Sequence, residues 1–191
     1  MEIKRVSLIE PASREPSMWN FIKQPRLGLV ILATILKNKG YEVRVFCESM
    51  SSIDWDFVYS SDLCGISCMT QTANPAYEIA EEVKKKKIPG IMGGRRVTFA
   101  PEEALEHCDV VVRGEGDNSF VELLEALKKN KSLKKIKGIS FKKSEKIVHN
   151  PAGKIVDINK LPSPDLSLVK GYTNKPRFDF SFYRLGNNPE F

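Results

Sequence analysis

Five short, largely apolar runs, each separated from the next by a helical or looped stretch, constrain the fold of this 191-residue chain most strongly. The runs lie at residues 6–9, 42–46, 63–67, 88–92 and 110–112. Apolar strands alternating with helices are typical of a parallel sheet that helices cover on both faces. The sequence therefore predicts an α/β fold: a flavodoxin-like (Rossmann-like), doubly wound, five-stranded parallel sheet with strand order 2-1-3-4-5.

The stretches between these runs carry helix signals. Residues 27–37 follow Pro25, stop before Gly40 and are apolar on all sides, so this helix is expected to be buried on more than one face. Asn74 and Pro75 mark the start of a helix that runs to about residue 86. A short helix at 101–105 and a longer one from residue 118 complete the pattern.

The alternation of apolar runs and helical stretches ends after residue 130, and the sequence predicts three regions. Residues 1–130 form the α/β domain, and residues 131–150 form a β-hairpin appendage built from 138–141 and 146–149. Residues 151–191 are punctuated by prolines and are predicted to be a linker toward a further domain. Residues 174–191 show no clear helical or strand period, and we interpret them as the start of a structural element that the given sequence does not complete.

Charge and hydropathy exclude several classes of protein. The net charge of +6 comes with lysines at 84–87 and between 128 and 146, without interleaved aromatic residues, so a solvated surface is favoured over nucleic-acid binding. No apolar stretch approaches the roughly 20 residues that span a bilayer, and the N-terminus leaves no room for a signal peptide. We expect a cytoplasmic protein that binds neither nucleic acid nor membrane.

The cysteines do not form a disulfide or metal-binding pattern. Cys64 and Cys68 have the spacing C-x-x-x-C, but no third cysteine follows at the C-x-x-C distance. Most cysteines lie in or beside predicted strands, where the side chain behaves as a small hydrophobe. No Ser-His-acid, Cys-His or paired-carboxylate arrangement can be assembled from the loops either. We therefore assign neither catalytic residues nor metal ligands.

Ligands of open parallel sheets bind beyond the carboxyl ends of the strands, which draws attention to four loops. These loops are residues 10–24, 68–73, 93–100 and 114–118. Gly93 and Gly94 end the fourth run and either admit a ligand close to the backbone or form a plain tight turn. In the second loop, hydroxyl side chains follow one another and either contact a ligand or satisfy local backbone groups.

The loop Gly114-Glu115-Gly116 leads from the fifth run to a helix N-terminus, which suits an anionic or hydroxyl-rich ligand. Glu115 offers an acceptor for ribose or amide donors. The alternative is that Asp117 or Asn118 simply caps the helix, which leaves the two glycines and Glu115 unexplained.

Several strings, in order, resemble the cobalamin-binding domains that precede radical S-adenosylmethionine (SAM) domains. They cover about residues 5–165 and are PRLGL at 25–29, GYEV at 40–43, GISCMT at 65–70, GG at 93–94 with VT at 97–98, PEEAL at 101–105, VVRGEG at 111–116 and LPSPD at 161–165.

The resemblance implies a cobalamin across the carboxyl end of the sheet, with its nucleotide tail buried between strands and helices. Ser67, Met69 and Thr70 would line the tail, the glycine pair would admit it, and the loop at 114–116 would flank its far side. The implied cofactor-binding residues are Ser67, Met69, Thr70, Gly93, Gly94, Arg95, Arg96, Val97, Gly114, Glu115 and Gly116.

The chain departs from the methionine-synthase-type pattern at two places. No Asp-x-His-x-x-Gly motif occurs between Glu10 and Leu27, and the only histidines, His107 and His149, are expected to be ordinary surface residues. A bound corrinoid is therefore expected to have no protein histidine on its cobalt. Where relatives often have a histidine after the glycine pair, Arg95 and Arg96 either pair with the cofactor phosphate or amide carbonyls or are solvated.

Radical SAM chemistry requires a C-x-x-x-C-x-x-C motif to hold a 4Fe-4S cluster, and the chain has none. The cluster and S-adenosylmethionine are thus expected only in a parent radical SAM enzyme, whose catalytic domain would be the partner in cis, and the chain alone is not expected to be catalytic. Two alternatives remain: a cofactor-free docking or substrate-gating domain of such a protein, or another flavodoxin-like binder such as a flavin protein or phospho-receiver.

Overall fold

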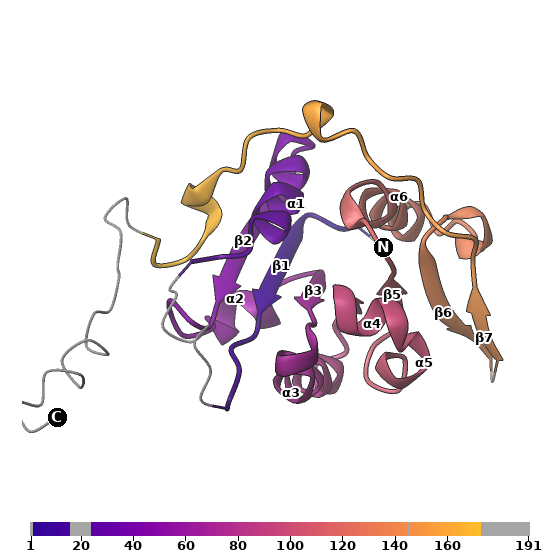
Figure 1. The fold of residues 1–191 in the computed structure, drawn as a ribbon, viewed down its shortest axis with the longest axis horizontal. Coiled ribbons are helices and arrows are strands. Elements are labelled where there is room, and N and C mark those ends of the chain that lie inside the picture. The colour runs from indigo at the N-terminus through magenta and orange to yellow at the C-terminus, as the bar shows by residue number, and fades with distance from the viewer. Residues whose placement is uncertain (1, 16–23, 145, 173–191) are drawn as a thin grey trace, which may run out of the picture.

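A computed structural model describes residues 2–15, 24–144 and 146–172 and contains a seven-stranded sheet with the order β2-β1-β3-β4-β5-β6-β7 (Figure 1). The pairs among the first five strands are all parallel, whereas β5–β6 and β6–β7 are antiparallel. The predicted order 2-1-3-4-5 and the flavodoxin-like α/β class are confirmed. The strands are β1 (Arg5–Glu10), β2 (Glu42–Cys47), β3 (Leu63–Ser67), β4 (Gly90–Gly93), β5 (Val110–Val112), β6 (Ile139–Lys143) and β7 (Lys146–His149).

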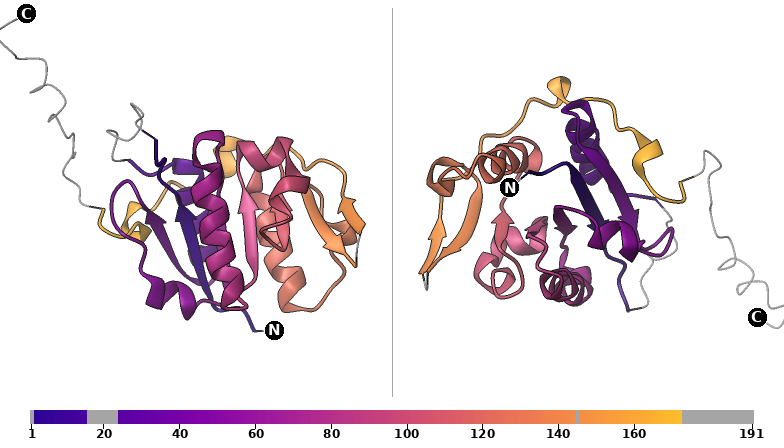
Figure 2. Two further views of the ribbon diagram at one scale, coloured as in Figure 1. Left: turned by 90° about the horizontal axis from the view of Figure 1, so that it is seen from below. Right: turned by 180° about the vertical axis from the view of Figure 1, so that it is seen from behind.

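Helices cover both faces of the sheet, as predicted, and each face has its own apolar core (Figure 2). On one face α1 and α6 pack on Val6 and Leu8, and on the other α2 to α5 pack on Ile9 and Ile66. The helices are α1 (Leu27–Asn38), α2 (Trp55–Tyr59), α3 (Ala73–Lys85), α4 (Arg95–Phe99), α5 (Pro101–Ala104) and α6 (Gly116–Lys128), with short 3-10 turns η2 (Thr70–Thr72), η3 (Leu133–Lys135), η4 (Ile158–Lys160) and η5 (Leu166–Leu168).

The predicted hairpin forms, but it extends the sheet instead of standing beside it. Strand β6 pairs with β5 in antiparallel register, with Ser140 opposite Val111. Ile139, Ser140 and Phe141 are all buried, because both faces of β6 are covered. The sheet therefore has seven strands, where the sequence predicted five plus an appendage.

Residues 151–172, which we call the strap, run from β7 to the opposite edge of the sheet across α1 and α6 (Figure 1). Asp165 accepts a hydrogen bond of 2.6 Å from Lys37, and its backbone N–H donates to the hydroxyl of Thr34, so the strap is fastened to α1. Farther on, Val169 is buried and forms a β-bridge with Val45 of β2. The strap thereby covers α1, which explains why this helix is apolar on more than one side. Residues 174–191, predicted to begin something further, lie outside the described residues.

All four cysteines are buried, whereas the sequence predicted three of them in or at the end of buried strands. Burial raises the pKa of Cys47 and Cys68 to about 11 and that of Cys64 and Cys108 to about 12. These thiols are therefore protonated at neutral pH and act as apolar packing groups.

Within residues 2–15, 24–144 and 146–172, no helix combines the length and the apolar character that crossing a membrane requires.

Candidate functional site

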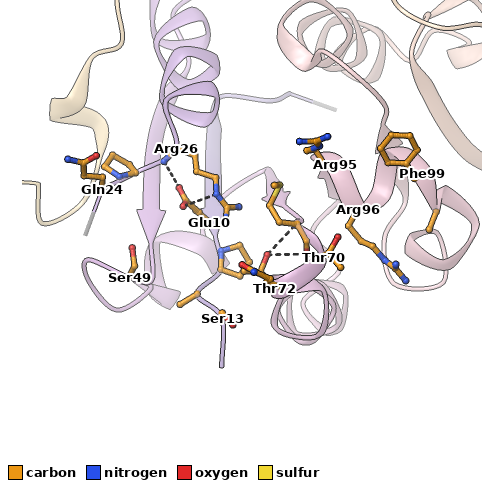
Figure 3. A pocket seen from close by; sticks show the side chains of 16 residues that line it. Glu10, Ser13, Gln24, Arg26, Ser49, Thr70, Thr72, Arg95, Arg96 and Phe99 are labelled. Atoms are coloured by element: carbon orange, nitrogen blue, oxygen red, sulfur yellow. Dashed lines mark hydrogen bonds and ion pairs between the residues drawn. The ribbon is translucent and has the colours of Figure 1, made fainter. Parts of the chain in front are cut away.

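A pocket of about 880 Å³ opens at the carboxyl edge of the sheet, where ligands of doubly wound sheets bind (Figure 3). Its walls come from the segments that follow β1, β2, β3 and β4 and from the residues before α1. The lining residues are Glu10, Pro11, Ala12, Ser13, Gln24, Pro25, Arg26, Ser49, Met69, Thr70, Gln71, Thr72, Arg95, Arg96, Phe99 and Ala100.

A buried carboxylate and an arginine form one wall of this pocket. Glu10, the last residue of β1, is only 6% exposed. Its Oε2 accepts the backbone N–H of Arg26 at 2.8 Å, and its Oε1 lies 3.5 Å from Nε of the same residue. Burial raises the pKa of Glu10, while the hydrogen bond and the charge of Arg26 oppose that shift. The pair joins the end of β1 to the start of α1.

The hydroxyl groups of the turn after β3 have different surroundings. The Thr72 hydroxyl accepts the backbone N–H of Met69 at 3.1 Å and so satisfies a local group. Thr70 is exposed and lines the pocket beside Met69. Ser67, at the end of β3, pairs in register with Gly93 of β4 and is not among the lining residues.

The glycine pair allows the chain to turn from β4 directly into α4. Gly94 has φ +108°, and a Cβ on it would lie 2.5 Å from the carbonyl oxygen of Cys68. That carbonyl accepts the N–H of Arg96 at 3.2 Å, and Cys68 donates its own N–H to Gly93 at 2.7 Å. The sequence predicted a loop at 93–100. The structure has the short helix α4 instead, held close to the turn after β3 because residue 94 has no side chain.

Thr98 of α4 connects the glycine pair to the loop after β5. Its hydroxyl donates to the carbonyl of Gly94 at 2.9 Å and accepts the N–H of Gly114 at 3.0 Å. Asp117 lies within the first turn of α6 and, like Asn118, does not occupy the cap position, so the simple capping alternative is wrong. Glu115 holds that position without a side-chain hydrogen bond to the helix.

The predicted binding residues separate into three groups. Met69, Thr70, Arg95 and Arg96 line the pocket. Residues 93, 94 and 97 shape the backbone of α4, with Val97 fully buried. Residues 67 and 114–116 lie along the same edge of the sheet outside the lining set. Sequence reasoning missed Glu10, Arg26 and Phe99 as lining residues, although a lone carboxylate ending an apolar strand was a usable signal for the first.

The two neighbouring arginines have different surroundings. Arg96 forms an ion pair with Glu103 of α5, which also accepts a hydrogen bond of 2.9 Å from Tyr77. Burial, followed by the contact with Glu103, raises the pKa of Tyr77 to about 12. Arg95 is exposed at the pocket and makes no hydrogen bond or ion pair with any residue that the structure describes.

Neither histidine lines the pocket. His107 stacks on Tyr77 with ring centroids 4.3 Å apart and lies 3.0 Å from Glu81. His149 of β7 contacts Ser140 at 2.9 Å and Glu102 at 3.1 Å. Among the described residues, no group of three or more histidine, cysteine or acidic side chains is arranged to hold a metal ion.

Comparison with known sequences identifies a family and several relatives. The family model described as "B12 binding domain" matches residues 23–124. An uncharacterized methyltransferase, PH0819, of Pyrococcus horikoshii is 32% identical over 157 residues, which is 76% of this chain and 34% of that protein. An anaerobic magnesium-protoporphyrin IX monomethyl ester cyclase of Cereibacter sphaeroides is 29% identical, covering 80% of this chain and 28% of the cyclase. The chain thus spans about a third of the length of these relatives.

Solved structures share the fold. The cobalamin-dependent S-adenosylmethionine radical enzyme OxsB, with aqua-cobalamin and S-adenosylmethionine bound, superposes with a TM-score of 0.70 at 22% identity, over 86% of this chain and 24% of OxsB. The radical S-adenosylmethionine methyltransferase TsrM from Kitasatospora setae, with cobalamin and a [4Fe-4S] cluster bound, gives a TM-score of 0.65 at 21% identity, over 85% of this chain and 31% of TsrM.

Proposed function

The chain belongs to the B12-binding domain family, and from that premise we propose that the pocket at the carboxyl edge of its sheet binds a corrinoid. The resemblance inferred from the sequence motifs is thereby confirmed at the level of the family. The observation that carries the proposal is the position of the pocket, since it opens over β1, β3 and β4 where doubly wound sheets bind their ligands.

The chemistry of the lining fits such a ligand. A corrinoid presents a broad apolar ring edged with amides and, in cobalamin, one phosphodiester. The pocket offers apolar surface from Phe99, which is 82% exposed, and donors from Thr70 and from three arginines. Among the described residues Nη1 of Arg26 is buried without a hydrogen-bond partner, so an acceptor oxygen on a ligand would be favoured there.

We further propose that the corrinoid is held without a protein histidine on cobalt. The two histidines of the chain are engaged with Glu81 and with Ser140 and Glu102, away from the lining residues. The lining also lacks cysteine, so no soft side-chain ligand of the chain faces the pocket among the described residues other than the thioether of Met69. The cofactor itself supplies the cobalt-centred chemistry, and the role of this chain is to bind and orient it.

The parent protein is proposed to be a radical SAM enzyme whose catalytic domain, in cis, binds a 4Fe-4S cluster and S-adenosylmethionine and carries out a methyl transfer or another radical reaction. Support comes from the relatives, two of which are a methyltransferase and a cyclase by name, and from the fold shared with the radical S-adenosylmethionine enzymes OxsB and TsrM. In this proposal the chain presents the corrinoid to that domain.

The first experiment mixes the purified chain with hydroxocobalamin, removes unbound ligand by desalting and records the visible spectrum of the protein fraction. Corrinoid absorbance that elutes with the protein supports the proposal. A protein fraction without that absorbance rejects direct binding and favours the cofactor-free docking or gating domain.

The absence of a cobalt-bound histidine is tested separately with cobinamide, which has no nucleotide base of its own. After reduction to the cobalt(II) state, the electron paramagnetic resonance spectrum of the bound ligand should show no axial nitrogen splitting. Nitrogen splitting in the complex of the wild-type chain, lost on replacing either histidine, would reject this part of the proposal.

A further inference from the structure

Arg26 has unused hydrogen-bonding capacity inside the pocket. Its Nε faces Oε1 of Glu10 at 3.5 Å, and Glu10 is the only acidic side chain in the described lining. Its Nη1 is buried and has no acceptor among the residues that the structure describes. A buried guanidinium N–H without an acceptor is costly, so this side chain is set up to gain from an oxygen supplied by a ligand.

Arg95 is the one lining residue whose charge is unbalanced among the residues that the structure describes. The charge of Arg26 is balanced by Glu10, and that of Arg96 is balanced by Glu103 of α5. Arg95 has no acidic partner among the residues that the structure describes. Figure 3 shows Arg96 turned away from the other two arginines, whereas the guanidinium groups of Arg26 and Arg95 remain in the pocket. The site therefore has a net charge of one positive unit, counting Glu103 with Arg96.

We propose that Arg26 and Arg95 together bind the phosphodiester of a corrinoid's nucleotide loop, with Glu10 as the positioning residue that holds Arg26. This inference rests on the proposed function and specifies which part of the ligand the pocket recognises. A phosphodiester carries one negative charge and two free oxygens, which match one unbalanced cation and two guanidinium groups. Arginine binds such oxygens through paired N–H groups, and this geometry is unavailable to lysine.

The test compares two ligands that differ in this group. Cobalamin contains the phosphodiester and the nucleotide, whereas cobinamide retains the corrin ring and its amides and lacks both. Dissociation constants are measured by calorimetry for the wild-type chain, Arg95→Gln, Arg95→Lys and Arg26→Gln. Lys142→Gln is the matched control. It also removes one positive charge, but from an exposed position of β6, which lies toward the other edge of the sheet from β2 and contributes no lining residue.

We expect Arg95→Gln to weaken cobalamin binding by about tenfold or more and to leave cobinamide binding unchanged. The control variant Lys142→Gln should bind both ligands as the wild-type chain does. Arg95→Lys should recover only part of the loss. Arg26→Gln should also weaken cobalamin binding. The thermal unfolding of this variant is measured in parallel, because the substitution also leaves Glu10 without its charged partner. Arg95 makes no described contact, so its variants should fold as the wild type does.

Equal losses for cobalamin and cobinamide would show that the arginines contact the corrin amides and would overturn the phosphodiester assignment while leaving corrinoid binding intact. If the Arg95 variants bind both ligands with unchanged affinity, the phosphodiester assignment is likewise overturned and corrinoid binding is left intact. If the wild-type chain binds neither ligand, both the inference and the proposed function fail.

Discussion

The conformation of Gly94 makes a strong prediction about stability. Its φ of +108° is disfavoured for any residue with a Cβ, and an alanine Cβ would lie 2.5 Å from the Cys68 oxygen and 3.1 Å from the Cys68 nitrogen. Both obstacles are backbone atoms of the turn after β3, so they cannot rotate away. Gly94→Ala combines the cost of a strained backbone with that of local overpacking, so it should lower the free energy of unfolding by about 2–5 kcal/mol.

Gly28→Ala is the matched control, because Gly28 lies in the first turn of α1 and an added Cβ there would meet nothing within 4 Å. It should be neutral or stabilise the chain by up to about 1 kcal/mol through helix propensity. Urea unfolding followed by circular dichroism measures both variants, and a 3 kcal/mol loss corresponds to a melting temperature lowered by roughly 6–12 °C. A Gly94→Ala midpoint equal to that of the wild type would refute the steric reasoning.

Three further predictions concern the strap, α4 and the cysteines. Lys37 lowers the pKa of Asp165 from 3.8 to about 2, so this pair stabilises the fold above about pH 4, and the gain disappears as the pH falls through about 2. Asp165→Asn should therefore lower the melting temperature at pH 7 and lower it much less at pH 2, and an equal effect at both pH values would contradict this. Thr98→Val removes the hydroxyl that joins Gly94 to Gly114 and should cost about 1 kcal/mol in urea unfolding, so an unchanged midpoint would count against that bridge. A thiol reagent at pH 8 should label none of the four buried cysteines in the folded chain and all of them in urea, whereas rapid labelling of the folded chain would contradict their burial.

Much of the parallel sheet could be predicted because its determinants are local. Each of the five runs is apolar and ends near a glycine, a polar turn or a helix start, and right-handed crossovers then leave few possible strand orders. The pairing of β6 with β5 was not predictable in this way. The alternation around Ile139 and Phe141 indicates a strand, but its partner lies more than 20 residues earlier and is chosen by the packing of the whole sheet.

The site was predictable only in part, for similar reasons. The glycine pair and the residues after β3 carry visible motifs, and their loops were identified. Helix α4 has five residues, and its formation depends on contacts with Cys68 that no local pattern encodes. The pairing of Glu10 with Arg26 spans 16 positions of a stretch without periodicity, so it emerges only when β1 and α1 are placed side by side.

The most direct test of the account is equilibrium dialysis of the chain against hydroxocobalamin, with bound ligand measured by absorbance. We expect saturable binding to a single site, with a dissociation constant in the micromolar range or below, and competition by cyanocobalamin. Retention no greater than that of the heat-unfolded chain would contradict the claim that the pocket at the carboxyl edge of this sheet binds a corrinoid.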